Sequence, residues 1–196
     1  MLDTHARRYV DPLIEAVARA LRAAGLSANT VTILGMLTGV GAAALVASGR
    51  PWIGVVLLWF SGLLDAADGT LARMTRSTPL GAIMDITFDR VVELSMVFAL
   101  AWRYPEARLI MVALAGTIAI AMSLFLSIAA ALRNTSAKAF HYAPGLGERS
   151  EAFVCLSLMA VDTAHLTLWT GVFLAVMVYT MFQRLRYAMR ALAAGG

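Results

Sequence analysis

Four aspartates stand in a stretch of the chain that is otherwise strongly apolar. Asp65 and Asp68 are three residues apart and Asp85 and Asp89 are four apart, so each pair shares one helical face. Carboxylates at membrane depth are costly and usually mark a functional site. Converging carboxylates repel one another unless cations lie between them. Because oxygen ligands suit Mg²⁺, Mn²⁺ or Ca²⁺ better than Zn²⁺, the pattern predicts a site for hard divalent metals.

The composition places this site in a membrane protein. Of the 196 residues, 60% are hydrophobic and 14% are charged, and the mean hydropathy is +0.76. A soluble domain of this size would carry far more charge, so the sequence predicts an integral membrane protein. The single cysteine, Cys155, excludes an internal disulfide and is expected to be a small apolar residue in a helix.

Residues 1–28 are expected to form an amphipathic juxtamembrane helix. Apolar side chains recur at helical spacing from Val10 to Leu21, whereas Glu15, Arg19 and Arg22 occupy other positions. This pattern favours a helix that lies in the membrane interface. The alternative is an ordinary surface helix that packs against a soluble partner.

Residues 29–196 are expected to form one catalytic domain of six transmembrane helices, so the predicted fold is all-α. The apolar segments cover about residues 29–48, 52–74, 80–102, 108–132, 151–161 and 166–183. Asp65 and Asp68 lie near the end of the second segment, and Asp85 and Asp89 near the start of the third. Pro79 interrupts the chain between these two segments.

The distribution of basic residues predicts the orientation in the membrane. With six spans, 12 of the 16 Lys and Arg residues fall on the side of the N-terminus, three fall on the opposite side and Arg90 falls within a span. Positive charge favours the cytoplasmic side. Trp52, Trp102 and Trp169 fall at the opposite helix ends, as in an aromatic belt. Both termini and the aspartates are therefore expected on the cytoplasmic side of the inner (cytoplasmic) cell membrane.

The acidic motif resembles the signature of the CDP-alcohol phosphotransferase (CDP-alcohol phosphatidyltransferase) family. The matching stretch reads Asp65-x2-Asp68-Gly69-x2-Ala72-Arg73, followed by Gly81-x3-Asp85-x3-Asp89. Asn29-x-x-Thr32 is similar to the family's Pro-Asn-x-x-Thr opening of the first span, with Ala28 in place of proline. Seven residues separate Arg73 from Gly81, where the family more commonly has eight.

The resemblance implies an enzyme that transfers a phosphatidyl-type group from CDP-diacylglycerol, or a related CDP-alcohol, to a small hydroxylated acceptor and releases CMP. It implies two Mg²⁺ or Mn²⁺ ions per site, because the diphosphate is anionic. Asp65, Asp68 and Asp85 would be metal ligands. Asp89 would share a metal and also act as the catalytic base toward the acceptor hydroxyl. A homodimer is implied by the resemblance alone.

The same resemblance implies a nucleotide-binding set. Gly69 and Ala72 would leave room for the nucleotide beside the helix, and Arg73 would donate to the diphosphate. Asn29 and Thr32 are further nucleotide-binding residues, although polar residues at a helix start also act as caps.

The acceptor site is expected to be basic. Arg149 lies in a stretch, Gly145-x-x-Glu148-Arg149-x-Glu151, that resembles phosphatidylinositol-phosphate synthase-like members of the family. Arg149, Arg133 and Arg90 would suit an acceptor that carries a phosphate, such as inositol phosphate or glycerol phosphate. Ala130 stands where inositol-phosphate members tend to carry a lysine, so the acceptor stays open.

Three other interpretations compete with this one. The aspartates could form a structural network with Arg73 and Arg90. A membrane prenyltransferase also uses aspartate-bound Mg²⁺ on a diphosphate, but it does not explain Gly69, Ala72 and Arg73. A divalent-cation transporter would need carboxylates in both leaflets, whereas these lie toward one side.

Overall fold

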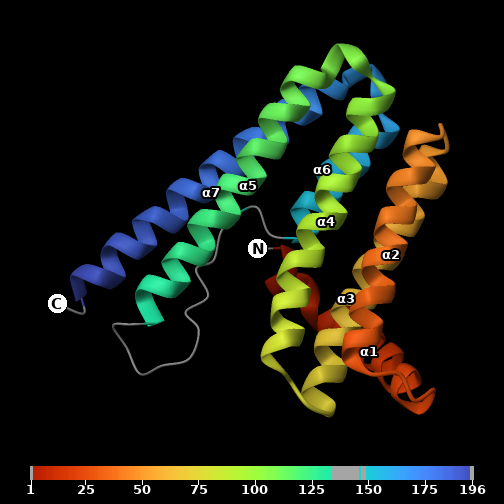
Figure 1. The fold of residues 1–196 in the computed structure, drawn as a ribbon, viewed down its shortest axis with the longest axis vertical. Coiled ribbons are helices and arrows are strands. Elements are labelled where there is room, and N and C mark those ends of the chain that lie inside the picture. Colours follow the sequence, from red (N-terminus) through yellow and green to blue (C-terminus); the bar gives the residue numbers. More distant parts are fainter. Residues whose placement is uncertain (1, 134–145, 147–148, 195–196) are drawn as a thin grey trace.

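A computed structural model describes residues 2–133, 146 and 149–194, and this part of the chain is built of helices without strands. Figure 1 shows the succession of α1 (Leu2–Ala23), α2 (Ala28–Ala47), α3 (Pro51–Met74), α4 (Pro79–Arg103), α5 (Arg108–Arg133), α6 (Arg149–Val161) and α7 (Leu166–Ala194). Short 3₁₀ turns, Pro105–Ala107 and Thr163–His165, join α4 to α5 and α6 to α7.

Local capping explains where the helices that carry the site begin. The Ser27 hydroxyl accepts a hydrogen bond from the amide of Thr30 (3.2 Å) at the start of α2. The Thr78 hydroxyl accepts one from the amide of Gly81 (3.0 Å) at the start of α4, where Pro79 takes the first helical position. The predicted break between the two aspartate pairs therefore lies where α3 ends and α4 begins.

The sixth apolar segment is longer than predicted. The apolar pattern predicts an end at residue 183, whereas α7 continues to Ala194. No proline or glycine stands between Gln183 and Ala194, and arginine and alanine both favour helix, so nothing local ends it earlier. The other ends of the six apolar segments lie within two residues of the observed helix ends, whereas α1 ends at Ala23, five residues before the predicted end at residue 28.

The helices form two groups that diverge. Helices α2, α3 and α4 lie side by side, and α6 packs against α3, α4 and α7. Helices α5 and α7 pack against each other and lean away from this bundle toward one end of the molecule (Figure 1). A continuous apolar core joins both groups and includes Leu58, Met96, Leu156 and Phe173. The aspartates lie at the end where the two groups are farthest apart.

Helix α1 packs beside the aspartate-bearing end of α3. Its Ala18 is fully buried and belongs to a small core with Val31, Leu64, Ala67 and Leu71. The predicted apolar face thus contacts α2 and α3 rather than lying free. Whether α1 also lies in the membrane interface remains a prediction.

Length and hydropathy identify four candidate membrane spans among the described residues, at Ala28–Ala47, Pro51–Met74, Pro105–Leu132 and Thr163–Ala193. Helix α4 falls outside this set because four charged residues, Asp85, Asp89, Arg90 and Glu93, lie in its first 15 residues. Helix α6 has 13 residues, about 20 Å at 1.5 Å per residue, against a hydrocarbon core of about 30 Å. The chain is therefore an all-α integral membrane protein, and the count of six crossings remains a prediction.

Candidate active site

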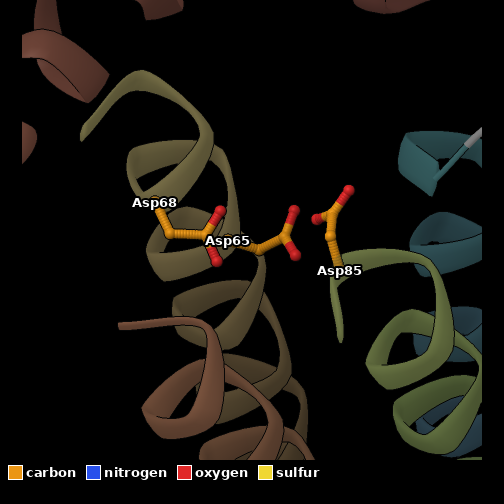
Figure 2. A group of neighbouring side chains, drawn as sticks. All are labelled: Asp65, Asp68 and Asp85. Atoms are coloured by element: carbon orange, nitrogen blue, oxygen red, sulfur yellow. The ribbon is translucent and has the colours of Figure 1, made fainter. Parts of the chain in front are cut away.

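Three of the four predicted aspartates converge. Asp65 and Asp68 come from the second half of α3, and Asp85 comes from the first turns of α4. One carboxylate oxygen of each lies within 4.8 Å of those of the other two. Figure 2 shows the three carboxylates in a row, with Asp65 between Asp68 and Asp85. Oxygen atoms this close can bind one cation or bridge two.

The donor set fits a hard divalent metal. Asp68 is only 4% exposed, and its Oδ2 is buried without a hydrogen-bond partner in the described part of the chain. A buried, unpartnered carboxylate oxygen beside two further carboxylates is costly unless a cation compensates it. The residues present therefore fit Mg²⁺ or Mn²⁺, which prefer oxygen ligands.

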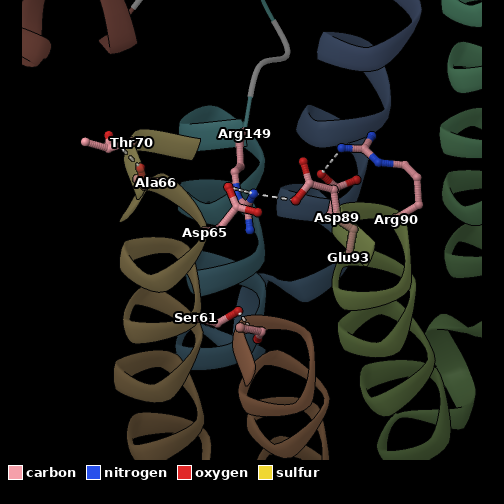
Figure 3. A network of polar contacts seen from close by, with 9 residues as sticks. Ser61, Asp65, Ala66, Thr70, Asp89, Arg90, Glu93 and Arg149 are labelled. Carbon is pink, nitrogen blue, oxygen red and sulfur yellow. Dashed lines mark hydrogen bonds and ion pairs between the residues drawn. The ribbon is translucent and has the colours of Figure 1, made fainter. Parts of the chain in front are cut away.

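The fourth aspartate, Asp89, contacts a cationic side chain instead. Arg149, at the start of α6, forms ion pairs with both Asp65 and Asp89 through the same guanidinium nitrogen (Figure 3). Asp89 is not part of the group of three oxygens, although Arg149 and Asp65 connect it to that group. Its predicted roles as a metal ligand and base remain predictions.

The structural network considered above is not formed with the arginines expected. Arg73 donates to the hydroxyl of Thr70 (2.8 Å), and Arg90 pairs with Glu93 (2.6 Å), which is 2% exposed. The described ion pairs join neither arginine to an aspartate of the motif, and Arg149 pairs with them instead. Glu93, one turn beyond Asp89, is a buried partner of Arg90.

A cavity of about 200 Å³ opens beside the aspartates, between the start of α2, the end of α3 and the start of α4. It is lined by Asp68 and Asp85 and by the residues predicted to bind the nucleotide, namely Asn29, Thr32, Gly69, Ala72 and Arg73. Residues from the start of α2 and residues from the α3–α4 region thus line the same cavity. The structure brings these residues together, and their binding role remains a prediction.

The connection between α3 and α4 also lines this cavity, through Arg76, Ser77 and Thr78. The sequence pattern predicts only a helix break here, at Pro79. Gly81 fits closely here, because a Cβ atom at this position would lie 3.1 Å from Asn29 Oδ1 and from Thr78 Oγ1. A Cβ atom at Gly69 would meet only Arg73 at 3.6 Å, so Gly69 leaves this wall of the cavity open.

Basic side chains gather on the other side of Asp89. Arg90 pairs with the Glu93 carboxylate (2.6 Å), and Arg149 and Arg184 lie within electrostatic range of the same carboxylate. Arg184 of α7 lies over the ring of Phe125, 4.8 Å from its centroid. Sequence reasoning missed Arg184, which it counted only toward the cytoplasmic excess of positive charge. The side chain of Arg133 and the loop that carries Lys138 lie outside the described residues.

Comparisons with known proteins agree with this geometry. The family model described as CDP-alcohol phosphatidyltransferase matches residues 26–183. The inner membrane protein YnjF of Escherichia coli K12 is 28% identical over 94% of this chain and 93% of its own. The phosphatidylinositol phosphate synthase of Mycobacterium tuberculosis H37Rv is 38% identical over 88 residues, which are 44% of this chain and 41% of that protein.

The fold is similar to that of solved structures. The crystal structure of the M. tuberculosis phosphatidylinositol phosphate synthase with manganese and citrate has a TM-score of 0.73 at 25% identity, over 90% of this chain and 88% of that one. The structure of this synthase with CDP-DAG bound has a TM-score of 0.76 at 24% identity, over 90% and 94%. The family match covers both aspartate pairs and favours a phosphatidyltransferase over a prenyltransferase or a cation transporter. The chain belongs to the CDP-alcohol phosphatidyltransferase family, whose members are transferases of phospholipid biosynthesis.

Proposed function

We propose that the protein transfers a phosphatidyl-type group from CDP-diacylglycerol, or a related CDP-alcohol, to a small acceptor that carries a hydroxyl and a phosphate. The observation that carries this proposal is the convergence of Asp65, Asp68 and Asp85 at the edge of the cavity lined by the motif residues. Relatives named for phosphatidylinositol phosphate synthesis support it. A related fold solved with CDP-DAG supports it as well.

Two Mg²⁺ or Mn²⁺ ions would be held by Asp65, Asp68 and Asp85, with Asp89 as a further ligand. Such ions neutralise a diphosphate and stabilise the charge that develops on departing CMP. The chain contributes closely spaced carboxylates, one buried and two half-buried, on α3 and α4, and the Thr78 cap fixes the start of α4. Asp68, with its unpartnered Oδ2, is the member most dependent on a cation.

The nucleotide would occupy the cavity between α2, α3 and α4. Gly69 and Ala72 present little bulk toward it, and Arg73 is an exposed guanidinium at its edge. A planar guanidinium can donate two parallel hydrogen bonds to phosphate oxygens. Asn29 and Thr32 close the opposite wall from the start of α2.

The acceptor would bind on the Arg149 side of the site. The Nε atoms of Arg149 and Arg90 are buried without a hydrogen-bond partner in the described part of the chain, so each retains a donor. A phosphate on the acceptor would use these donors, and Arg133 is a further candidate. The acceptor's hydroxyl would then lie near Asp89. Asp89 would take the hydroxyl proton as the acceptor oxygen attacks the phosphatidyl phosphorus. The bond from phosphorus to the CMP oxygen breaks, and CMP leaves with the electron pair.

The placement in the membrane follows from the distribution of charge. We expect six crossings in residues 29–196, residues 1–28 in the interface, and both termini and the site on the cytoplasmic side. The acceptor and the nucleotide would then arrive from the cytoplasm and the lipid from the bilayer. A homodimer is expected from family resemblance.

Labelled CDP-diacylglycerol supplied to the purified protein tests the proposal. Glycerol phosphate, inositol phosphate, inositol, serine and choline would be offered in turn with Mg²⁺ or Mn²⁺. We expect CMP release and a labelled lipid product with an acceptor that carries a phosphate. Turnover with only the neutral or zwitterionic acceptors would refute the acceptor proposal, and no metal-dependent CMP release with any acceptor would refute the transferase proposal.

A further inference from the structure

Helices α3 and α6 meet through three paired positions in an antiparallel register. The pairs are Trp59 with Ser157, Gly62 with Phe153, and Asp65 with Arg149. Residue numbers rise along α3 as they fall along α6, by three or four per step, as expected for facing turns. This register decides which residue of α6 stands opposite Asp65.

Phe153 occupies the middle position and touches the groups on both sides of it. It is 3% exposed, and its ring centroid lies 5.3 Å from the guanidinium carbon of Arg149. The same ring meets Trp59 edge to face, with centroids 5.9 Å apart and planes at 85°. Both arrangements are favourable, the first between a cation and the ring face and the second between two aromatic rings.

Gly62 makes room for the ring, and Ser157 fixes the Trp59 indole beside it. A Cβ atom at position 62 would lie 2.8 Å from a ring carbon of Phe153, so only glycine lets the ring lie against α3. The Trp59 indole donates a hydrogen bond to the Ser157 hydroxyl (3.1 Å). That hydroxyl in turn donates to the backbone carbonyl of Phe153 (2.6 Å). The ring therefore packs against Gly62 and Trp59 of α3, and Ser157 fixes the Trp59 indole that meets the ring.

We infer that Phe153 is a positioning residue whose ring, seated against Gly62 and Trp59, holds the Arg149 guanidinium between Asp65 and Asp89. An arginine side chain loses considerable rotamer freedom when it is fixed. A guanidinium that is already in place spares the acceptor that ordering cost. The inference rests on the proposed function in one respect, namely that Arg149 contacts the acceptor's phosphate.

Steady-state kinetics of two substitutions tests the inference. Phe153→Leu and Gly62→Ala should each raise the KM of the acceptor by roughly three- to thirtyfold and leave that of the CDP-alcohol unchanged. The matched control is Gly171→Ala, because a Cβ atom there would meet nothing within 4 Å. A trifluorinated phenylalanine at position 153 keeps the ring but weakens its negative face, so it should give a smaller rise of the acceptor KM. An equal rise of both KM values would overturn the inference.

A double-mutant cycle separates positioning of Arg149 from a general role in packing. In the Arg149→Ala background, Phe153→Leu should raise the acceptor KM no further, because the side chain that the ring holds is gone. Independent, additive effects of the two substitutions on KM would overturn the inference.

The failure of the proposed acceptor contact would be recognised separately. If Arg149→Ala alone leaves the acceptor KM unchanged, the acceptor proposal is wrong. A cycle on thermal unfolding of the purified protein then decides the inference. The Tm losses of Phe153→Leu and Arg149→Ala should be less than additive if the ring holds the guanidinium, whereas full additivity would overturn it.

Discussion

The cavity side and the α6 side of helix α4 carry the same kind of side chain in opposite electrostatic surroundings. Asp85 faces the cavity beside Asp65 and Asp68, and no described ion pair reaches Asp85 or Asp68. Asp89, one turn further along, pairs with Arg149, and Glu93 in the next turn pairs with Arg90. The first region has an excess of anionic oxygen and suits cations. The second has buried guanidinium donors and suits an anion.

This contrast explains how one site can handle two anionic substrates. A CDP-alcohol needs cations between its diphosphate and the carboxylates, whereas a phosphate-bearing acceptor can use arginine directly. Asp65 belongs to both regions, because it is a member of the metal-binding group and a partner of Arg149. We therefore expect substitutions on the two sides to have different kinetic signatures.

The largest effect is expected on the cavity side. Asp65→Asn, Asp68→Asn and Asp85→Asn should each lower metal-dependent turnover by about a thousandfold or more, because a metal ligand contributes several kcal/mol. Glu106→Gln is the control, since this exposed carboxylate follows the opposite end of α4. CMP release and thermal unfolding would be measured together. Near-normal turnover in two of the three variants would contradict the two-metal assignment.

Asp89→Asn should separate binding from chemistry. Loss of a general base lowers the rate by about a hundred- to ten-thousandfold, while affinity for the CDP-alcohol should be largely kept because the group of three carboxylates is intact. Single-turnover rates and equilibrium nucleotide binding provide the two readouts. If affinity falls as steeply as the rate, Asp89 acts mainly as a metal ligand.

Gly69→Leu should weaken nucleotide binding by at least about tenfold, because a branched side chain would enter the cavity and lose the ligand contacts there. Competition by CMP measures the effect. Gly116→Leu is the control, because a Cβ atom there meets nothing within 4 Å. Unchanged CMP competition in Gly69→Leu would remove the nucleotide from the proposed cavity.

The smallest of these effects is expected on the Arg149 side. Arg149→Ala should raise the acceptor KM by roughly ten- to a hundredfold, since a charge-assisted hydrogen bond contributes about 1.5–3 kcal/mol. The KM of the CDP-alcohol should change much less. An equal loss for both substrates would indicate that Arg149 mainly orders the start of α6.

The sequence was informative about the cavity side because its motif is local. Asp65, Asp68 and Gly69 lie within one helix, and a cap and a proline fix the start of the next, so spacing alone predicts which side chains share a face. The predicted helix ends rested on the same kinds of residue, namely caps and prolines. The end of α7 was missed, because no residue type marks it.

The α6 side depends on tertiary packing that spacing does not reveal. Arg149 lies far along the chain from Asp65 and meets it only because α3 and α6 pack in one register, which Gly62 and Phe153 help to set. Neither residue belongs to the acidic motif. Arg184 reaches the same region from α7, and its sequence surroundings indicate only a basic helix end.

Binding of Mn²⁺ to the purified protein, followed by electron paramagnetic resonance, tests the central claim most directly. The wild-type chain and Glu106→Gln should bind two ions per chain in the presence of CDP-diacylglycerol. Asp68→Asn should bind fewer ions, or bind them at least about tenfold more weakly, because it loses a buried carboxylate ligand. Mn²⁺ binding of unchanged stoichiometry and affinity in Asp65→Asn, Asp68→Asn and Asp85→Asn would contradict the assignment of these aspartates as the metal site.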